Sequence, residues 1–202
     1  MSYNKGNSVI INLCYDGKVN TNRLENLVIK FQQTGSDESF AELYAEYSQN
    51  ILQYLQYLTN NNTADIQDLS QDIWIKVIHK RNSLKTPSAF KQWLYRIAKT
   101  SYINHFNKNK NDKIEYGNDF ENTAISEEEI DSFINEENKS QVQEIISTLP
   151  EEKKTILWLR TVEGYSHKEI ASILKIPDGT VRSRLHNIIE DIKHILKKGE
   201  IK

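Results

Sequence analysis

Apolar residues recur at the three- and four-residue spacing of an α-helix along most of this chain, and no segment alternates apolar and polar residues as a half-buried strand does. The first such block, residues 23–108, contains four apolar stripes, which predict four helices packed into one domain. The stripes consist of Leu24, Leu27, Val28 and Phe31; of Phe40, Leu43, Tyr44, Tyr47, Ile51, Leu55 and Leu58; of Ile66, Leu69, Ile73 and Val77; and of Phe90, Trp93, Leu94, Ile97, Ala98 and Ile103.

Residues that begin or end helices separate these stripes. Gly35 ends the first predicted helix, and Ser36 is placed to cap the second. Thr63 begins the third predicted helix. Thr86 followed by Pro87 has the order of a cap and a first-turn residue, which predicts that the fourth helix opens there.

The second block, residues 139–198, predicts a short capped helix, a tight turn and a longer helix. Ser166 and Glu169 have the spacing of a capping box, and their helix ends near Leu174. The last helix begins at Thr180 and carries one apolar face, formed by Val181, Leu185, Ile188, Ile192 and Ile195. This order of elements is that of a helix-turn-helix.

Polar sequence precedes and separates the two blocks. Residues 109–138 contain ten acidic residues and few apolar anchors, so they are predicted to form a flexible acidic linker. Residues 1–22 are predicted to be a disordered N-terminal extension. The expected fold is therefore all-α, with two small helical domains joined by that linker.

The basic residues follow the same division, although the formal net charge is only -2. Residues 74–110 hold nine basic and no acidic residues, and residues 139–202 hold twelve basic and nine acidic residues. Any one charge run can be a solvated helix face. Charge boundaries that coincide with changes in apolar pattern nevertheless favour two basic domains, so the net charge does not exclude a nucleic-acid partner.

Composition excludes several other classes of protein. No apolar run approaches the ~20 residues of a membrane span, so we expect no membrane insertion. Residues 1–22 lack the features of a secretory signal, which makes the cytoplasm the expected location. The single cysteine, Cys14, excludes an internal disulfide and a zinc signature. Because no phosphate-cradling glycine loop or nucleophile motif is present, we expect no enzyme, metal or cofactor.

Donor side chains lie opposite the apolar face of the last predicted helix. They are Arg182, Ser183, Arg184, His186 and Asn187. Peptide N–H groups at a helix N-terminus favour a phosphate, while Arg and Asn can read guanine and adenine in the major groove. An ordinary solvent-facing helix has the same pattern, and spacing alone leaves both interpretations open.

Aromatic residues interleave with the cations of residues 74–106, a combination that suits single-stranded nucleic acid because bases stack on rings while cations hold the backbone. Several of these rings must belong to the core, and we expect packing roles for Phe90, Trp93 and Ile97. The residues expected to be exposed are Lys91, Tyr95, Arg96 and Lys99.

The third predicted helix turns Asp65, Asp68, Gln71 and Asp72 outward. Paired carboxylates occur in metal and acid–base sites, but no His lies at a matching spacing. A docking surface for another protein fits this face better.

Short runs in both blocks point to one family. The first block contains DESFAELY (37–44), DLSQD (68–72) and FKQWLYRIA (90–98). The second contains LPEE (149–152), EGYS (163–166), EIA (169–171) and GTVRSRLH (179–186). In this order and spacing they resemble regions 2 and 4 of a bacterial RNA polymerase sigma factor of the sigma-70 family, most closely the extracytoplasmic-function (ECF) type.

The resemblance implies a factor that binds core RNA polymerase, directs it to promoters and helps to open the −10 element. It implies that Asp68, Gln71 and Asp72 dock on the β′ clamp. It implies that residues 82–89 and the following helix capture unstacked −10 bases, with contacts from Lys85, Lys91, Trp93, Tyr95, Arg96, Lys99 and Thr100. The −35 element would be read, beside the polymerase β flap, by Thr180, Arg182, Ser183, Arg184, His186 and Asn187.

Further expectations come with the same resemblance. The acidic linker, residues 109–138, corresponds to the segment that enters the active-site and RNA-exit channel of the polymerase, and members of the family are commonly held inactive by an anti-sigma factor. Two alternatives stay open at this point. One is a stand-alone helix-turn-helix DNA-binding regulator, and the other is a protein that binds polymerase or another protein without reading DNA.

Overall fold

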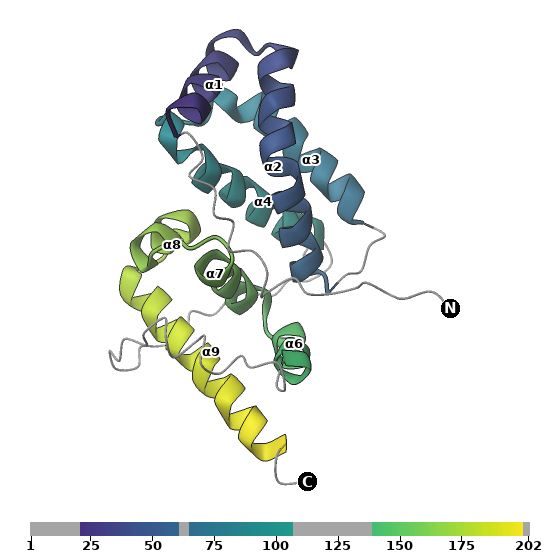
Figure 1. Ribbon diagram of the computed structural model, residues 1–202, viewed down its shortest axis with the longest axis vertical. Helices are drawn as coiled ribbons and strands as arrows, with labels where there is room; N and C mark the ends of the chain where they lie inside the picture. Colours follow the sequence, from purple (N-terminus) through teal and green to yellow (C-terminus); the bar gives the residue numbers. More distant parts are fainter. Residues whose placement is uncertain (1–20, 61–64, 107–138, 200–202) are drawn as a thin grey trace. The chain divides into compact units, whose positions relative to one another are not determined.

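The computed structural model describes residues 21–60, 65–106 and 139–199, so the predicted acidic linker and nearly all of the predicted extension lie outside the described residues. The described residues form α-helices and two short 3₁₀ turns, with no β-strand among them. They fall into two compact units that divide between Asn111 and Asp112 (Figure 1). The prediction of an all-α fold is confirmed.

The first unit begins with a helical corner formed by α1 (Thr21–Thr34) and α2 (Asp37–Leu58). Gly35 connects them with a φ of +61°, a left-handed conformation that glycine adopts without steric strain. The Ser36 hydroxyl accepts a hydrogen bond from the backbone N–H of Ser39 at 3.3 Å, as expected of an N-cap. The predicted helix end and cap are both confirmed, although α1 starts within the predicted extension.

The other long helices of this unit are α3 (Ile66–Lys80) and α4 (Phe90–Phe106), and α3 packs against both α2 and α4. The first turn of α3 follows Asp65, whereas the predicted start, Thr63, lies outside the described residues.

Tyr44, assigned to the apolar stripe of α2, is 43% exposed. The core contains Val28, Phe31, Leu43, Ile51, Tyr54, Leu55, Leu69, Ile73, Val77, Leu94 and Ala98.

The connection from α3 to α4 contains two 3₁₀ turns, η1 (Arg81–Ser83) and η2 (Pro87–Ala89). Thr86 and Pro87 occupy the N-cap and first-turn positions as predicted, but they open a 3₁₀ turn. The prediction that the α-helix itself starts there is wrong, and the Thr86 side chain makes no capping hydrogen bond. The Ala89 N–H instead bonds to the Thr86 carbonyl at 3.0 Å, which closes a tighter 3₁₀ turn before α4 starts at Phe90.

Within residues 139–199, the second unit is built around its last helix, against which the other helices pack. Its elements are α6 (Lys139–Thr148), α7 (Glu151–Thr161), α8 (His167–Leu174) and α9 (Asp178–Gly199). The last helix starts two residues before the predicted Thr180, because the Pro177 carbonyl already accepts the Thr180 N–H at 3.0 Å. Buried residues include Ile146, Ile156, Trp158, Leu159, Ile170, Val181, Leu185 and Ile188. None of the helices in the described ranges is long and apolar enough to cross a membrane.

Candidate nucleic-acid interface

The turn between α8 and α9 fixes the direction of the candidate DNA-reading helix. The Ser166 N–H donates to Glu169 Oε2 at 2.9 Å, and the Glu169 N–H donates to Ser166 Oγ at 3.4 Å, which completes the predicted capping box. Hydrogen bonds from the Ser166 hydroxyl and backbone hold the pKa of the Glu169 carboxyl below its usual range. At the other end of α8, Lys175 adopts a φ of +57° and turns the chain towards α9.

The first turns of α9 separate a buried apolar face from a polar face. Val181, Leu185 and Ile188 are buried, whereas Arg182 and Asn187 are exposed. The remaining predicted donors Thr180, Ser183 and His186 are half-buried.

Arg182 does not stand alone on this face. Its guanidinium forms an ion pair with Asp178, one turn earlier on α9. The four-residue spacing of this pair is visible in the sequence, so the contact could have been predicted there. Asp178 therefore sets the direction in which Arg182 leaves the helix.

Arg184 has a different environment from Arg182. Its side chain is only 19% exposed, and Nη1 lies 2.8 Å from Glu152 Oε2 on α7. This contact ties α9 to α7 within the second unit. Local sequence gives no signal for it, because the two residues are far apart in the chain and meet only after the helices pack.

The loop and helix that follow α3 carry the cations predicted to contact the −10 element. Lys85 is exposed in the loop between η1 and η2, and Thr100 is exposed on α4. Lys91, Arg96 and Lys99 are half-buried along the same helix. The structure therefore keeps all four predicted cations accessible from solvent.

The two aromatic candidates on α4 differ. Trp93 is half-buried, with its ring centroid 5.8 Å from that of Phe90 and its Nε1–H donating to Ser83 Oγ at 3.3 Å. Tyr95 is 1% exposed, and its ring packs edge-on against Tyr54 of α2 at 5.3 Å. The prediction that Tyr95 is exposed to nucleic acid is wrong, because position 95 of α4 faces the core against α2.

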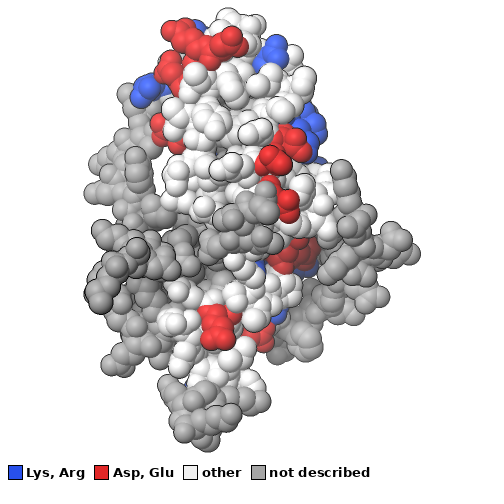
Figure 2. Space-filling model, turned by 90° about the vertical axis from the view of Figure 1, so that its right-hand side faces the viewer, with Lys and Arg blue, Asp and Glu red and all other residues white. Residues whose placement is uncertain are grey.

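The acidic face of α3 is exposed as predicted, with Asp68, Gln71 and Asp72 open to solvent. Sequence reasoning missed Ile75, which is 50% exposed and continues the same helical face. Its spacing from Asp68, Gln71 and Asp72 was the available signal. Figure 2 shows acidic side chains at several places on the side of the first unit that it displays, with basic side chains beside them. In the part of the chain that the structure describes, no group of three or more His, Cys, Asp and Glu side chains is placed to hold a metal ion.

Comparison with known proteins relates both units to one family. The family model of Sigma-70 region 2 matches residues 43–111, and that of Sigma-70 region 4 matches residues 139–192. The ECF RNA polymerase sigma-E factor of Haemophilus influenzae is 32% identical to the chain over 84% of the chain and 94% of that protein. The chain belongs to the ECF type of sigma-70 family sigma factors.

Other similar proteins agree with this membership. The RNA polymerase sigma-H factor of Pseudomonas aeruginosa is 28% identical, over 88% of this sigma factor and 96% of the relative. The solved structure of CnrH in complex with the cytosolic domain of CnrY has the same fold, with a TM-score of 0.62, 16% identity, and coverage of 87% of this chain and 97% of that chain.

As a sigma factor, the chain directs RNA polymerase to promoters. Regions 2 and 4 lie on one chain, so the alternative of a stand-alone helix-turn-helix regulator is wrong. The helices α3 and α4 lie within the region 2 match, and α8 together with most of α9 lies within the region 4 match.

Proposed function

We propose that the two units of this sigma factor divide promoter recognition between them. A domain of residues 139–198 reads the −35 element through α9, and a domain of residues 23–108 docks on core polymerase and opens the −10 element. An acidic linker of residues 109–138 joins them. The chain acts as an initiation factor, without catalysing a reaction and without a cofactor or metal.

The observation that carries the −35 assignment is the two-faced start of α9. Its buried face is fixed against the rest of the second unit, so the opposite face is held outward in one orientation. Arg182 and Asn187 on that face carry the donors that suit guanine and adenine edges. Thr180, Ser183 and His186 flank them, and we assign contacts with the DNA backbone to these three residues. Arg184, which is bonded to Glu152 of α7, holds α9 in place.

The −10 assignment rests on the accessible cations after α3. Lys85, Lys91, Arg96 and Lys99 can hold a phosphate backbone, while Thr100 and the half-exposed ring of Trp93 offer a hydroxyl and a stacking surface to unpaired bases. Tyr95 has no place in this set, because its ring is in the core.

The docking assignment rests on the exposed face of α3. Asp68, Gln71 and Asp72 supply acceptors for the β′ clamp of core polymerase, and Ile75 adds an exposed apolar side chain to the same face. The second unit is assigned a contact with the β flap. The complex of CnrH with the cytosolic domain of CnrY supports a further proposal, that an anti-sigma factor binds this chain.

Transcription with purified components tests the proposal. Core RNA polymerase and the full chain are incubated with genomic DNA, and transcript 5′ ends are sequenced to define promoters. We expect Arg182→Ala to reduce promoter-specific transcripts about tenfold, because one bidentate base contact is lost. Lys197→Ala, which removes an exposed cation near the other end of α9, is the matched control and should leave transcript levels unchanged.

Two results would contradict the proposal. Absence of any specific transcript with the wild-type chain would reject promoter opening. Unchanged promoter use by Arg182→Ala would reject −35 reading by α9 and favour a second unit that binds only protein.

A further inference from the structure

The loop of residues 82–89 connects α3 to α4. One of its side chains is buried and another is hydrogen-bonded to α4, while most of the others face solvent. Leu84 is buried, and Ser83 Oγ accepts the hydrogen bond from Trp93 Nε1. The exposed residues of the loop are Asn82, Ser83, Lys85, Thr86 and Ser88. A backbone with few regular hydrogen bonds needs such anchors to hold one conformation.

One side chain of α1 supplies an additional anchor from outside the loop. Gln32 Nε2 donates two hydrogen bonds, to the Arg81 carbonyl at 3.0 Å and to the Leu84 carbonyl at 2.7 Å. The Arg81 carbonyl belongs to the first residue of the η1 turn, and the Leu84 carbonyl belongs to the residue that follows the turn, after the regular part of α3 has ended. Both N–H bonds of the Gln32 amide are therefore used to fix the spacing of the loop's first residues.

The corner between α1 and α2 makes a second close contact, with Arg81 just before the loop. A Cβ atom on Gly35 would lie 2.9 Å from Arg81 Nη2, so the guanidinium packs directly over the glycine. Arg81 Nη1 also donates to the Ile78 carbonyl at 3.2 Å, which closes the end of α3. The end of α1 and the start of the loop thus share one packed contact.

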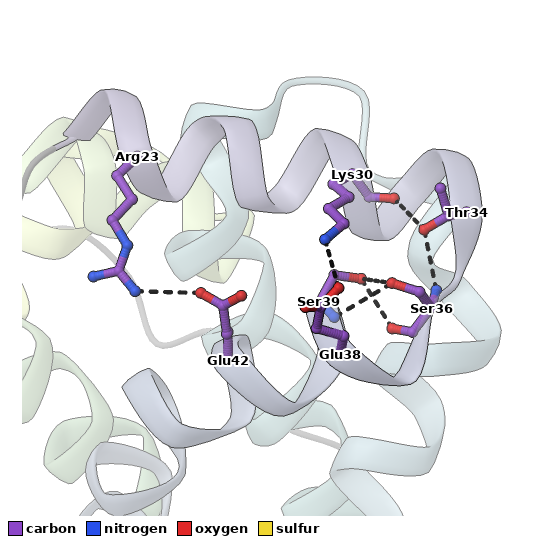
Figure 3. A network of polar contacts seen from close by, with 7 residues as sticks. All are labelled: Arg23, Lys30, Thr34, Ser36, Glu38, Ser39 and Glu42. Carbon is purple, nitrogen blue, oxygen red and sulfur yellow. Dashed lines mark hydrogen bonds and ion pairs between the residues drawn. The ribbon is translucent and has the colours of Figure 1, made fainter.

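The α1–α2 corner is itself held by several polar contacts, so it offers a fixed support (Figure 3). The ion pairs Lys30–Glu38, at 2.8 Å, and Arg23–Glu42, at 3.3 Å, join the two helices, and the Ser36 cap starts α2. Figure 3 shows these contacts distributed along the facing sides of α1 and α2.

We propose that Gln32 is a positioning residue for −10 base capture: its amide holds residues 82–89 in the conformation that receives the unstacked base. This inference rests on the −10 function proposed for the first unit, and on the capture of an unstacked base by residues 82–89 that the resemblance to sigma factors implies. Gln32 itself is half-buried beneath the loop and acts through the Arg81 and Leu84 carbonyls. Without its two hydrogen bonds, the loop must be ordered when DNA binds, which weakens capture.

Binding of single-stranded promoter DNA tests this role. Holoenzyme is assembled from the full chain and core RNA polymerase, and its affinity is measured for the non-template −10 strand of a promoter mapped by transcript 5′ ends. Oligonucleotides with one abasic site at each −10 position locate the captured base. Gln32→Met keeps the length of the side chain and removes the donor, and Gln33→Met, at the exposed neighbouring glutamine, is the matched control.

We expect Gln32→Met to bind the intact oligonucleotide about tenfold more weakly than the wild type, because two hydrogen bonds are lost. It should also lose most of the penalty that the wild type shows at the abasic position, since capture is already impaired. Gln32→Glu, which turns carboxylate oxygens towards two carbonyls, should be weaker still. Affinity for core polymerase and for a −35 duplex should stay at the wild-type value, as should every property of Gln33→Met.

Other outcomes reject the inference in distinguishable ways. Wild-type oligonucleotide binding by Gln32→Met would show that the loop needs no anchor from α1. A parallel loss of core polymerase binding would show a role in folding of the first unit alone. Insensitivity of the wild type to every abasic site would reject base capture by this sigma factor, and with it the proposed function of the loop.

Discussion

Arg182 and Arg184 stand two positions apart on α9, yet their surroundings suit different tasks. Arg182 is exposed, and its partner Asp178 belongs to the same helix, so the pair can turn towards DNA without disturbing the fold. Arg184 is partly buried and bonded to Glu152 of α7, so moving it towards a base would break an interhelical contact. A guanidinium held between helices acts on DNA chiefly by keeping α9 in place.

This difference predicts that Arg184→Ala lowers the local unfolding free energy of the second unit by about 1 kcal/mol. Glu152→Ala should cost a similar amount, and the double variant should cost less than the two single changes added together. Amide hydrogen exchange in α7 and α9 measures the effect, with Arg182→Ala as the control that leaves α7 unchanged. Unaltered exchange combined with lost promoter binding would instead place Arg184 on DNA.

Among the elements, α8 is short, and its N-terminal capping box therefore has a large influence on it. Ser166→Ala should lower the stability of the second unit by about 1 kcal/mol, because an N–H of the first turn loses its acceptor.

The pKa of Glu169 is lower in the folded protein than its ordinary value of 4.5. Its stabilisation is therefore complete above that value and is lost as the pH falls through the lower, folded pKa.

Glu169→Gln separates the effect of the carboxylate charge from the effect of the capping hydrogen bonds, because an amide can still accept a hydrogen bond but does not ionise. We expect the wild type to be more stable than the variant at about pH 6, and this advantage to shrink towards about pH 3.5. Urea unfolding, monitored by hydrogen exchange in α8, measures the difference in unfolding free energy between the two proteins at each pH. A difference that stays constant over this range would mean that the carboxylate charge contributes nothing to the cap.

Helix ends set by local chemistry were the elements best predicted from the sequence. The Ser36 cap, the Gly35 helix end and the Ser166–Glu169 box each depend on residues within three or four positions, and all are confirmed. The misassignment of Tyr95 overlooked a local signal, because Tyr95 stands three residues before Ala98 and seven before Tyr102, and all three are buried. Its ring partner Tyr54, on another helix, gives no such signal. The Arg184–Glu152 and Gln32–loop contacts were likewise missed because their partners lie on other elements.

At the scale of the whole molecule, charge is distributed by segment, and this was readable from the sequence alone. The net charge of -2 combines two blocks with a basic excess and a strip that holds ten acids at residues 111–138. A polyanion such as DNA meets each block separately, so the local balance decides binding more than the sum does. Which cations are accessible could not be read in this way, because accessibility depends on how the helices pack.

The same distribution predicts a separable role for the acidic strip. The resemblance to sigma factors implies that this segment enters a channel built to accept RNA, so its negative charge should favour occupation of the channel before RNA is made. Replacing the ten acids of residues 111–138 by Asn and Gln should therefore alter the ratio of abortive to full-length transcripts. Promoter binding should stay close to the wild-type value.

A shuffled segment with unchanged composition is the matched control, and it should behave as the wild type if charge is what matters. Added salt should reduce the difference between the neutralised chain and the wild type, since screening weakens the attraction of the strip to the channel. Transcript profiles and promoter binding are measured on the same template. Loss of promoter binding in the neutralised chain would contradict the prediction, because it would place the acids in recognition of DNA instead of in the steps that follow it.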